Sequence, residues 1–246
     1  MVFENAVSTY VKNIGILLVF SVSFLLALLM PLFASTPTYN AVGATFLRFL
    51  SIPEMSLMDI GVIVFAFLLS NYFVAFGVVA VNLIVKKERV QVNLTQEILE
   101  SIPRSTLVLF LIFVFLFLVN FVVQFVLAEL QAPYWLAGLV FLLIYLPTFY
   151  VGPAIVIDQM KPVHAVYASV QHIRNYPYRV VKWVAAGIVM LLVATVGAYL
   201  ILPAYFQWAT LIINSFVIIP FLIVYQAHNY IEKYTILKKP SRGRKR

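Results

Sequence analysis

The side chains that could do chemistry in this chain are few and widely spaced. There are three histidines, His164, His172 and His228, and no cysteine. His164 and His172 are eight residues apart, whereas two metal ligands on one helix typically stand four apart. The motifs H-E-x-x-H, G-x-S-x-G, G-x-x-x-x-G-K-S/T and G-x-G-x-x-G do not occur. The sequence therefore predicts a protein that is not an enzyme, with no catalytic residue, metal site or cofactor.

Four amide side chains form the candidate polar cluster, because they fall inside long apolar stretches: Asn71, Asn120, Gln124 and Asn214. Asn120 and Gln124 are four residues apart, so they would share one helix face, which is expected to turn toward other helices. Two interpretations are open. The amides either join helices, at about 0.6 kcal/mol per contact, or line a path for lipid or an uncharged solute. The stretches carry no charged residue away from their ends, which argues against an ion pump.

The composition is that of a membrane protein. The chain has 246 residues, of which 63% are hydrophobic and 11% charged, whereas a soluble domain has about 45 to 50% apolar and about 25% charged residues. Apolar stretches of about 20 residues, the length that crosses a bilayer, recur along the sequence. The predicted fold class is an all-α integral membrane protein.

We predict six transmembrane helices in three hairpins: 14–33, 60–85, 105–127, 134–157, 180–202 and 209–225. The first is expected to be retained rather than removed as a signal peptide, because its apolar run exceeds the usual 7 to 15 residues. Pro147 and Pro153 in the fourth helix, and Pro220 in the sixth, are expected to interrupt their helices.

The charges predict the orientation of these spans. Of the 17 Lys and Arg residues, all except Arg48 would lie on the same side of the membrane. Basic residues mark the cytoplasmic side, so we expect a multi-pass protein of the cell membrane with both termini cytoplasmic.

Three connections carry secondary-structure signals of their own. Segment 93–104 has apolar residues on one helical face and predicts an amphipathic cytoplasmic helix that Pro103 ends. In the external connection 34–59, the stretch "AVGATFLRFL" predicts a helix on the membrane surface, with a lid as the alternative. The second long cytoplasmic connection contains a helix that starts at Pro162 and stops before Pro177.

The helix after Pro162 is amphipathic and too short to span, so it is expected to lie along the cytoplasmic face. Apolar residues recur at helical spacing: Val163, Val166, Tyr167, Val170 and Ile173. We expect Val166, Val170 and Ile173 to pack against the bundle or the lipid interface. Ala165 and Ser169, one turn apart, would permit a close approach to a neighbouring helix. Asp158 just upstream would lie near the positive end of this helix.

The stretches "PAIVID" and "HAVYASVQHIRNYPYRVVKW" resemble the six-helix membrane domain of glycerophosphodiester phosphodiesterase-type proteins and its stand-alone relatives. In that family an apolar helix with a proline ends in an acidic residue, and a cytoplasmic helix with spaced Ala, Ser and basic residues leads into the next span. The matching residues here are Pro153, Asp158, Ala165, Ser169 and Arg174. The family's two-domain members hydrolyse their substrate in a separate soluble barrel. The resemblance therefore implies the fold and not that activity.

The end of the chain is a basic tail, 238–246, which follows the membrane domain, 1–237. Its charged residues are Lys238, Lys239, Arg242, Arg244, Lys245 and Arg246. Such residues are attracted to anionic headgroups, so membrane lipids are the expected partners. No nucleic acid is expected, because no aromatic platform or recognition fold accompanies the charge.

These observations favour a non-enzymatic protein that organises lipid, or a partner protein or a second copy of the chain, at the cytoplasmic face. The alternative is a carrier for lipid or an uncharged small solute.

Overall fold

The structure is a computed structural model, and it describes the chain except residues 1, 34–37, 42–43, 48–54, 91–95 and 238–246. The described residues are helical apart from one two-stranded hairpin and short connections. Six helices are long and apolar enough to cross a membrane, at positions that agree with the six predicted spans. The basic tail lies outside the described residues.

The elements follow in this order: α1 (Val2–Lys12), α2 (Ile14–Phe33), β1 (Thr38–Ala41), β2 (Ala44–Leu47), α3 (Leu57–Val90), α4 (Gln96–Glu129), α5 (Tyr134–Tyr145), the 3-10 turn η2 (Leu146–Thr148), α6 (Val151–Val156), α7 (Pro162–Asn175), α8 (Pro177–Ile201), α9 (Phe206–Ile213), the π-helical segment η3 (Asn214–Ile218) and α10 (Ile219–Leu237).

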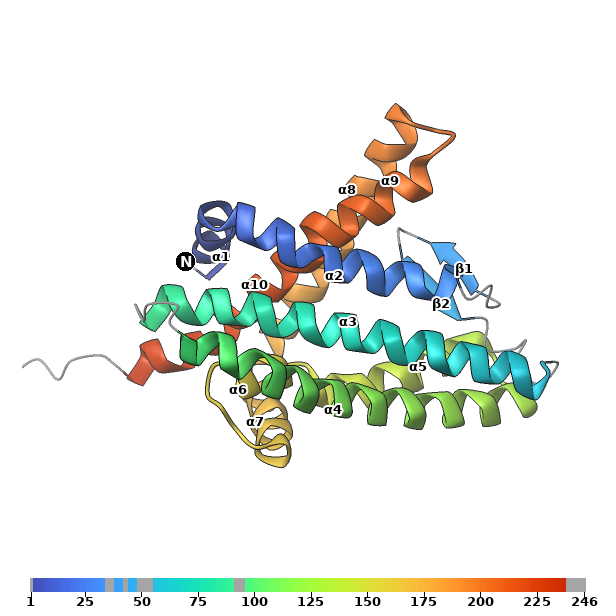
Figure 1. Ribbon diagram of the computed structural model, residues 1–246, viewed down its shortest axis with the longest axis horizontal. Helices are drawn as coiled ribbons and strands as arrows, with labels where there is room; N and C mark the ends of the chain where they lie inside the picture. Colours follow the sequence, from blue (N-terminus) through green and yellow to red (C-terminus); the bar gives the residue numbers. More distant parts are fainter. Residues whose placement is uncertain (1, 34–37, 42–43, 48–54, 91–95, 238–246) are drawn as a thin grey trace, which may run out of the picture.

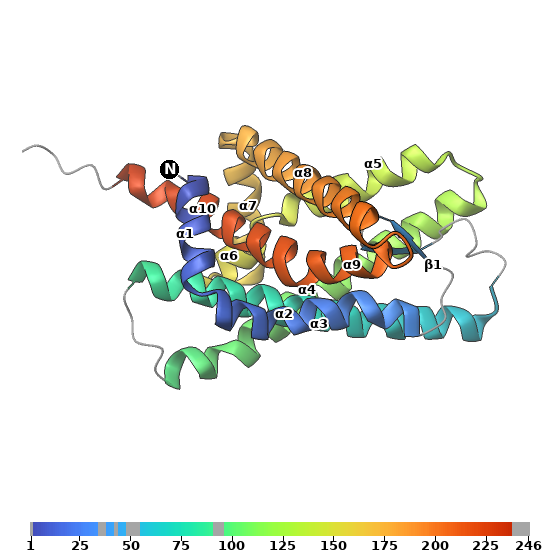
Figure 2. The same cartoon turned by 90° about the horizontal axis from the view of Figure 1, so that it is seen from above.

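The long helices α2, α3 and α4 run side by side, and α3 packs along both of its neighbours (Figures 1 and 2). α1 and α7 lie across the direction of these helices, at the end of the bundle where α10 also ends. We call this the α1/α7 end, and the opposite end, which carries β1 and β2, the hairpin end. The grouping of the six spans into three hairpins stays a prediction, because α4 packs on α3 as well as on α5.

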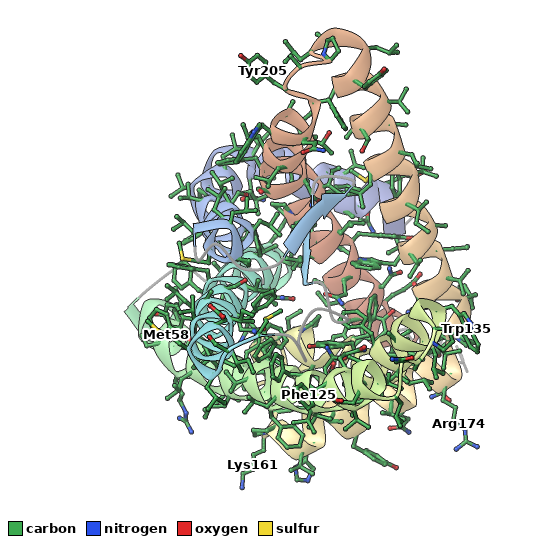
Figure 3. The ribbon with its side chains drawn as sticks, turned by 90° about the vertical axis from the view of Figure 1, so that its right-hand side faces the viewer. Met58, Phe125, Trp135, Lys161, Arg174 and Tyr205 are labelled. Atoms are coloured by element: carbon green, nitrogen blue, oxygen red, sulfur yellow. The ribbon has the colours of Figure 1, made fainter. Side chains whose placement is uncertain are left out.

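The pair α8 and α9 stands apart from α4 and α5, with Tyr205 at its tip (Figure 3). Only 11% of the apolar stretch of α8 is buried, compared with 61% of the apolar stretch that runs through α9, η3 and α10. α8 therefore presents most of its apolar surface outward.

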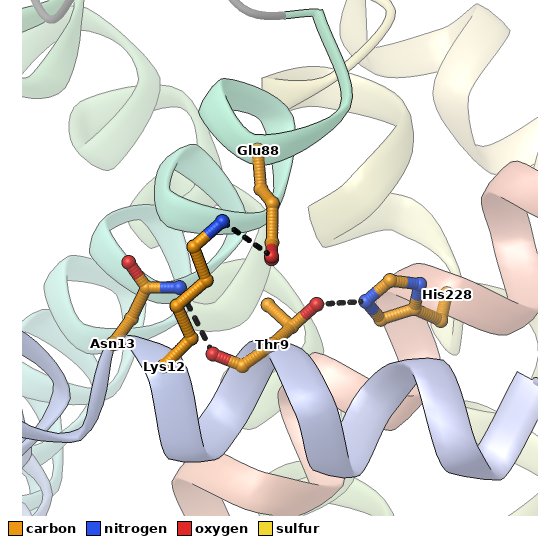
Figure 4. Close-up of polar contacts among 5 residues, drawn as sticks. All are labelled: Thr9, Lys12, Asn13, Glu88 and His228. Atoms are coloured by element: carbon orange, nitrogen blue, oxygen red, sulfur yellow. Dashed lines mark hydrogen bonds and ion pairs between the residues drawn. The ribbon is translucent and has the colours of Figure 1, made fainter.

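α1 was not predicted from the sequence. It buries Ala6, Thr9 and Tyr10 and packs on α10. Figure 4 shows its polar contacts, a hydrogen bond between Thr9 Oγ1 and His228 Nε2 (2.9 Å) and an ion pair between Lys12 and Glu88 (3.5 Å). The ion pair is largely exposed on its Lys12 side and contributes little, so burial and the hydrogen bonds of Thr9 and Tyr10 hold α1 in place.

Prolines shape the packing of three spans. Proline lacks the N–H that would bond the carbonyl four residues earlier, and in an apolar region that carbonyl needs another donor. Side chains of other helices supply it. The three pairs are Ser70 Oγ to Ala27 O (2.7 Å) for Pro31, Gln226 Nε2 to Phe149 O (2.5 Å) for Pro153, and Tyr10 Oη to Phe216 O (3.2 Å) for Pro220.

The predicted interruption of the fourth span is confirmed at Pro147, which lies in η2 between α5 and α6. The sixth span changes to a π-helical turn over Asn214–Ile218, just before Pro220. Burial raises the pKa of the Tyr10 phenol above its usual range, so this side chain stays protonated and can donate to the Phe216 carbonyl.

Gly77 sets the distance between α2 and α3. A Cβ atom at this position would lie 2.5 Å from both the Phe24 ring and Ser23 Oγ. Because such distances are far below van der Waals contact, α2 can approach α3 this closely only where the side chain is a hydrogen atom.

Two predictions about the connections were wrong. Pro103 does not end a separate helix but lies inside α4, because a single missing hydrogen bond does not break an apolar helix held by its neighbours. The stretch 41–50 is not a surface helix where it is described: Ala44–Leu47 forms β2 and pairs antiparallel with Thr38–Ala41. Its β-branched and aromatic residues favour this pairing, and its other residues lie outside the described part.

Candidate functional site

The predicted close approach of α7 is present. Ala165 and Ser169 are fully buried against the core, and Ser169 Oγ accepts a hydrogen bond from the backbone N–H of Tyr150 at 2.9 Å. This N–H lies at the break between η2 and α6, so Ser169 satisfies a backbone donor that the interrupted helix exposes. The small side chains thus dock α7 onto the broken fourth span.

The predicted apolar face of α7 is divided between two sides. Val166 and Ile173 pack against the core formed by α3, α4 and α6, as predicted. Val170 is 44% exposed and does not belong to that buried set, so of its two predicted surroundings the bundle is excluded and the lipid interface stays a prediction. The physical reason is that Ala165 and Ser169 are the residues in closest contact, and the helix is rotated to place them innermost.

Asp158 and Arg174 are placed differently from each other. Asp158 Oδ2 accepts a hydrogen bond from Tyr230 Oη of α10 at 2.6 Å, which ties the α6–α7 connection to the last helix. Arg174 is exposed near the end of α7 (Figure 3). No contact assigns it a role beyond charge at this surface.

An aromatic cluster lies behind α7. The fully buried Tyr150 ring contacts His172 (centroids 4.5 Å apart) and Tyr230 (6.0 Å). The Tyr150 hydroxyl has no hydrogen-bond partner among the described residues. His172 also lies against Tyr176 and Tyr230, so its burial is explained by ring packing.

Arg179 is the most connected charge at the α1/α7 end, and it is only 4% exposed. Its guanidinium donates to the Asn229 carbonyl (2.7 Å), forms an ion pair with Glu232 (2.7 Å) and lies over the Tyr176 ring (4.3 Å to the centroid). Such a buried cation needs this set of partners. In the sequence Arg179 is only one positive charge among others, because the carbonyl that it binds lies 50 residues further along the chain.

Beside Arg179 a cleft of about 490 Å³ opens between α1, α8 and α10. Its polar wall contains Arg179, Lys182, Asn229 and Glu232. Its other residues are mainly apolar: Val2, Phe3, Ala186, Tyr225 and the ring of Tyr178. The cleft is therefore amphipathic, with cationic groups along one side.

A second cavity, of about 300 Å³, lies between α4 and the connection from α6 to α7. Its polar lining consists of Ser101, Arg104, Ser105, Gln159 and Lys161. Arg104 and Lys161 are both exposed, so this cavity is a basic indentation of the surface rather than an enclosed site.

Of the four amides, Asn120 and Gln124 form one pair on α4, and Asn71 and Asn214 lie on other helices. Gln124 is fully buried and donates to the Ala137 carbonyl of α5 (2.9 Å) and to Asn120 Oδ1 (3.3 Å). Asn71 donates to the Phe67 carbonyl of its own helix (2.7 Å). Asn214 is buried in η3, which packs against α2 and α8 to α10. The inward orientation predicted for the Asn120 and Gln124 face is what the structure shows.

No protein-family model, no curated protein and no solved structure matches the chain. Within the described ranges, no group of three His, Asp or Glu side chains is placed to hold a metal ion. The fold of the described residues defines the class of the protein by itself: a mainly helical chain with six helices long and apolar enough for a multi-pass membrane protein.

Proposed function

We propose that the chain is a non-enzymatic protein of the cell membrane that organises anionic lipid at the cytoplasmic face. The α1/α7 end would be the cytoplasmic end, because the basic residues of α1, the end of α3, the start of α4 and the α7–α8 region belong to it. The basic tail follows α10 and would add its charge on the same side.

The observation that carries this proposal is a pair of exposed apolar stripes on the two helices that lie across the bundle. On α1, the exposed apolar residues are four apart: Phe3, Val7 and Val11. On α7 they are Val163, Tyr167 and Val170. Each helix thus has one face docked on the protein and another apolar face left uncovered, as expected of helices that lie in the membrane interface.

Each uncovered stripe lies directly beside polar residues, and contact with water would be unfavourable for its apolar side chains. Val11 is 61% exposed beside Lys12, and Val163 is 79% exposed beside His164. An apolar stripe next to polar residues suits the boundary between headgroups and acyl chains. Lipid organised there would meet both the stripe and the nearby cations.

The absence of cysteine permits a direct test. Single-cysteine variants at Val7, Val11, Val163 and Val170 are spin-labelled in vesicles of phosphatidylcholine with phosphatidylglycerol. We expect these labels to collide with oxygen dissolved in lipid more than with a water-soluble nickel complex. Labels at the exposed polar positions Ser8 and Gln171 of the same helices should show the reverse. Equal collision patterns at stripe and polar positions would remove the basis of the proposal.

The second candidate function, a carrier for lipid or an uncharged solute, has one observation in its favour. Gln124 Oε1 is buried and accepts no hydrogen bond from the described residues, so an unsatisfied polar atom lies among apolar helices. Replacing Asn120 and Gln124 together with leucine distinguishes the two functions. If the amides only join helices, thermal stability falls modestly, whereas loss of lipid or solute flux across proteoliposomes supports the carrier.

A further inference from the structure

We propose that the amphipathic cleft between α1, α8 and α10 binds one anionic phospholipid, with the phosphodiester at the polar wall and the acyl chains along α8. This inference rests on the proposed membrane function, and it adds a specific site and a ligand class. Phe3 belongs both to the cleft and to the stripe of α1, but the cleft adds a polar wall, whereas the stripes would contact lipid of any kind.

The polar wall contains a donor that lacks an acceptor. Asn229 is 3% exposed, and its Nδ2 has no hydrogen-bond partner among the described residues. Its backbone carbonyl is already used by Arg179 (2.7 Å). A buried amide that donates to nothing is costly, so this position favours a ligand that brings an oxygen acceptor.

The charges of the wall match a monoanion. Arg179 is neutralised by Glu232, at 2.7 Å. Lys182 forms no ion pair with any described residue, and its Nζ lies 5.4 Å from the centroid of the Tyr178 ring. One positive charge thus remains uncompensated at the cleft. A phosphodiester carries one negative charge and offers the oxygen acceptors that Lys182 and Asn229 lack.

The opposite wall is apolar. Phe3 of α1 meets Phe221 and Tyr225 of α10 edge to face, with centroids 5.7 Å apart in both pairs. Ala186 stands one helical turn beyond Lys182 on α8 and is small enough to leave the space open. The cleft therefore receives a charged group on one side and a hydrocarbon on the other.

One side of the cleft is lined by α8, the least buried of the six spans. Beyond Ala186, Val189 and Val193 follow on the same face of α8, and both are apolar and exposed. An acyl chain that starts at the cleft would run along this surface. A free phosphate compound would use only the polar wall, which is why a phospholipid is the occupant that fits both walls.

The test uses the full chain reconstituted in phosphatidylcholine vesicles that contain phosphatidylglycerol with a photoactivatable diazirine in one acyl chain. Adducts on peptides of α1, α8 and α10 are quantified by mass spectrometry. Unlabelled phosphatidylglycerol should compete. Diacylglycerol, which lacks the phosphate, and glycerol 3-phosphate, which lacks the acyl chains, should not. Competition by glycerol 3-phosphate would show a site for soluble phosphates and overturn the proposal, as would absence of adducts in the cleft.

Two variants examine the polar wall. Lys182→Gln should weaken competition by phosphatidylglycerol about fivefold, the effect of about 1 kcal/mol for one basic residue at a membrane surface. Lys161→Gln, at another exposed lysine of the same end, is the matched control and should leave it unchanged. An equal effect of both substitutions would show general surface attraction instead of a site.

Asn229→Leu separates ligand binding from folding. Because it removes an unsatisfied buried donor, it should preserve or raise the thermal stability of the delipidated protein, while lowering the extra stability that added phosphatidylglycerol confers on the natural chain. If lipid stabilises both proteins equally, the Asn229 donor does not bind phosphate and the proposal fails.

Should the cleft variants have no effect while the stripe labels still report lipid, only this inference fails. If the stripe labels report water, the proposed function fails first.

Discussion

Gln226 of α10 donates its side-chain N–H to the carbonyl oxygen of Phe149 at 2.5 Å, and this carbonyl is the one that Pro153 leaves without a helical partner. The two residues are 77 positions apart in the sequence. In an apolar region a carbonyl without a donor costs several times the value of an ordinary hydrogen bond. The broken fourth span therefore depends on α10. The same helix also contacts the side chains of Arg179 and Asp158.

Removing this donor is expected to destabilise the fold. Gln226→Leu should lower the free energy of unfolding by about 1 to 3 kcal/mol, the cost of leaving a buried acceptor unsatisfied. Pro153→Ala in the same protein restores a backbone N–H that can bond Phe149, so the double variant should recover most of the loss. Denaturation in detergent, followed by helical circular dichroism, measures both values. A double variant as unstable as Gln226→Leu alone would mean that the Phe149 carbonyl is not what Gln226 serves.

Gly77 offers a test of helix packing. Gly77→Ala places a Cβ 2.5 Å from the Phe24 ring and from Ser23 Oγ, so α2 and α3 must separate, at a cost of about 1 to 3 kcal/mol. Gly61→Ala lies on the same helix with nothing within 4 Å, and it should be neutral or slightly stabilising because alanine favours a helix. The two melting temperatures, compared with that of the natural chain, decide the matter.

The parts of the fold that the sequence predicts are those set by local composition. Hydropathy over about 20 residues locates a span, and Pro147 predicts the break at Leu146–Thr148, because both signals lie in the segment concerned. α1 cannot be predicted in this way. Its buried Ala6, Thr9 and Tyr10 and its exposed Val7 and Val11 give no single apolar face, since one side docks on protein and another is uncovered.

The candidate cleft could not be predicted from the sequence for a related reason. In the sequence Lys182 is an ordinary charge and Asn229 an ordinary amide, and they line one cleft only because α8 and α10 meet at the α1/α7 end. The amides Asn120 and Gln124 were found because their spacing of four is itself a local signal. What the sequence lacks is the partner of each polar group.

The orientation of the six spans is tested by labelling in intact cells. A cysteine that replaces Gln207, which is exposed at the tip of the α8–α9 pair, should react with a membrane-impermeant thiol reagent. A cysteine at Gln131, in the turn between α4 and α5, should react as well, whereas one at Ser241 in the tail should react only after permeabilisation. Labelling at Ser241 in intact cells, with protection at Gln207, would invert the cytoplasmic assignment of the α1/α7 end.

The division of the α7 face yields the last prediction. Val166 packs against the core of α3, α4 and α6, so Val166→Asp buries a charge without a partner and should release α7, which then becomes sensitive to protease added from the α1/α7 side.

Val170 is 44% exposed on the uncovered stripe, so Val170→Asp should leave α7 docked and protected. It should, however, reduce the collision of a spin label at Val163 with oxygen in the lipid, because a charge seven residues along the stripe pulls this face toward water. Gln171→Asp, on the polar side, should change neither readout. Release of α7 by Val170→Asp as readily as by Val166→Asp would show that Val170 is buried in the membrane-bound protein, and the stripe would have to be reassigned to protein packing.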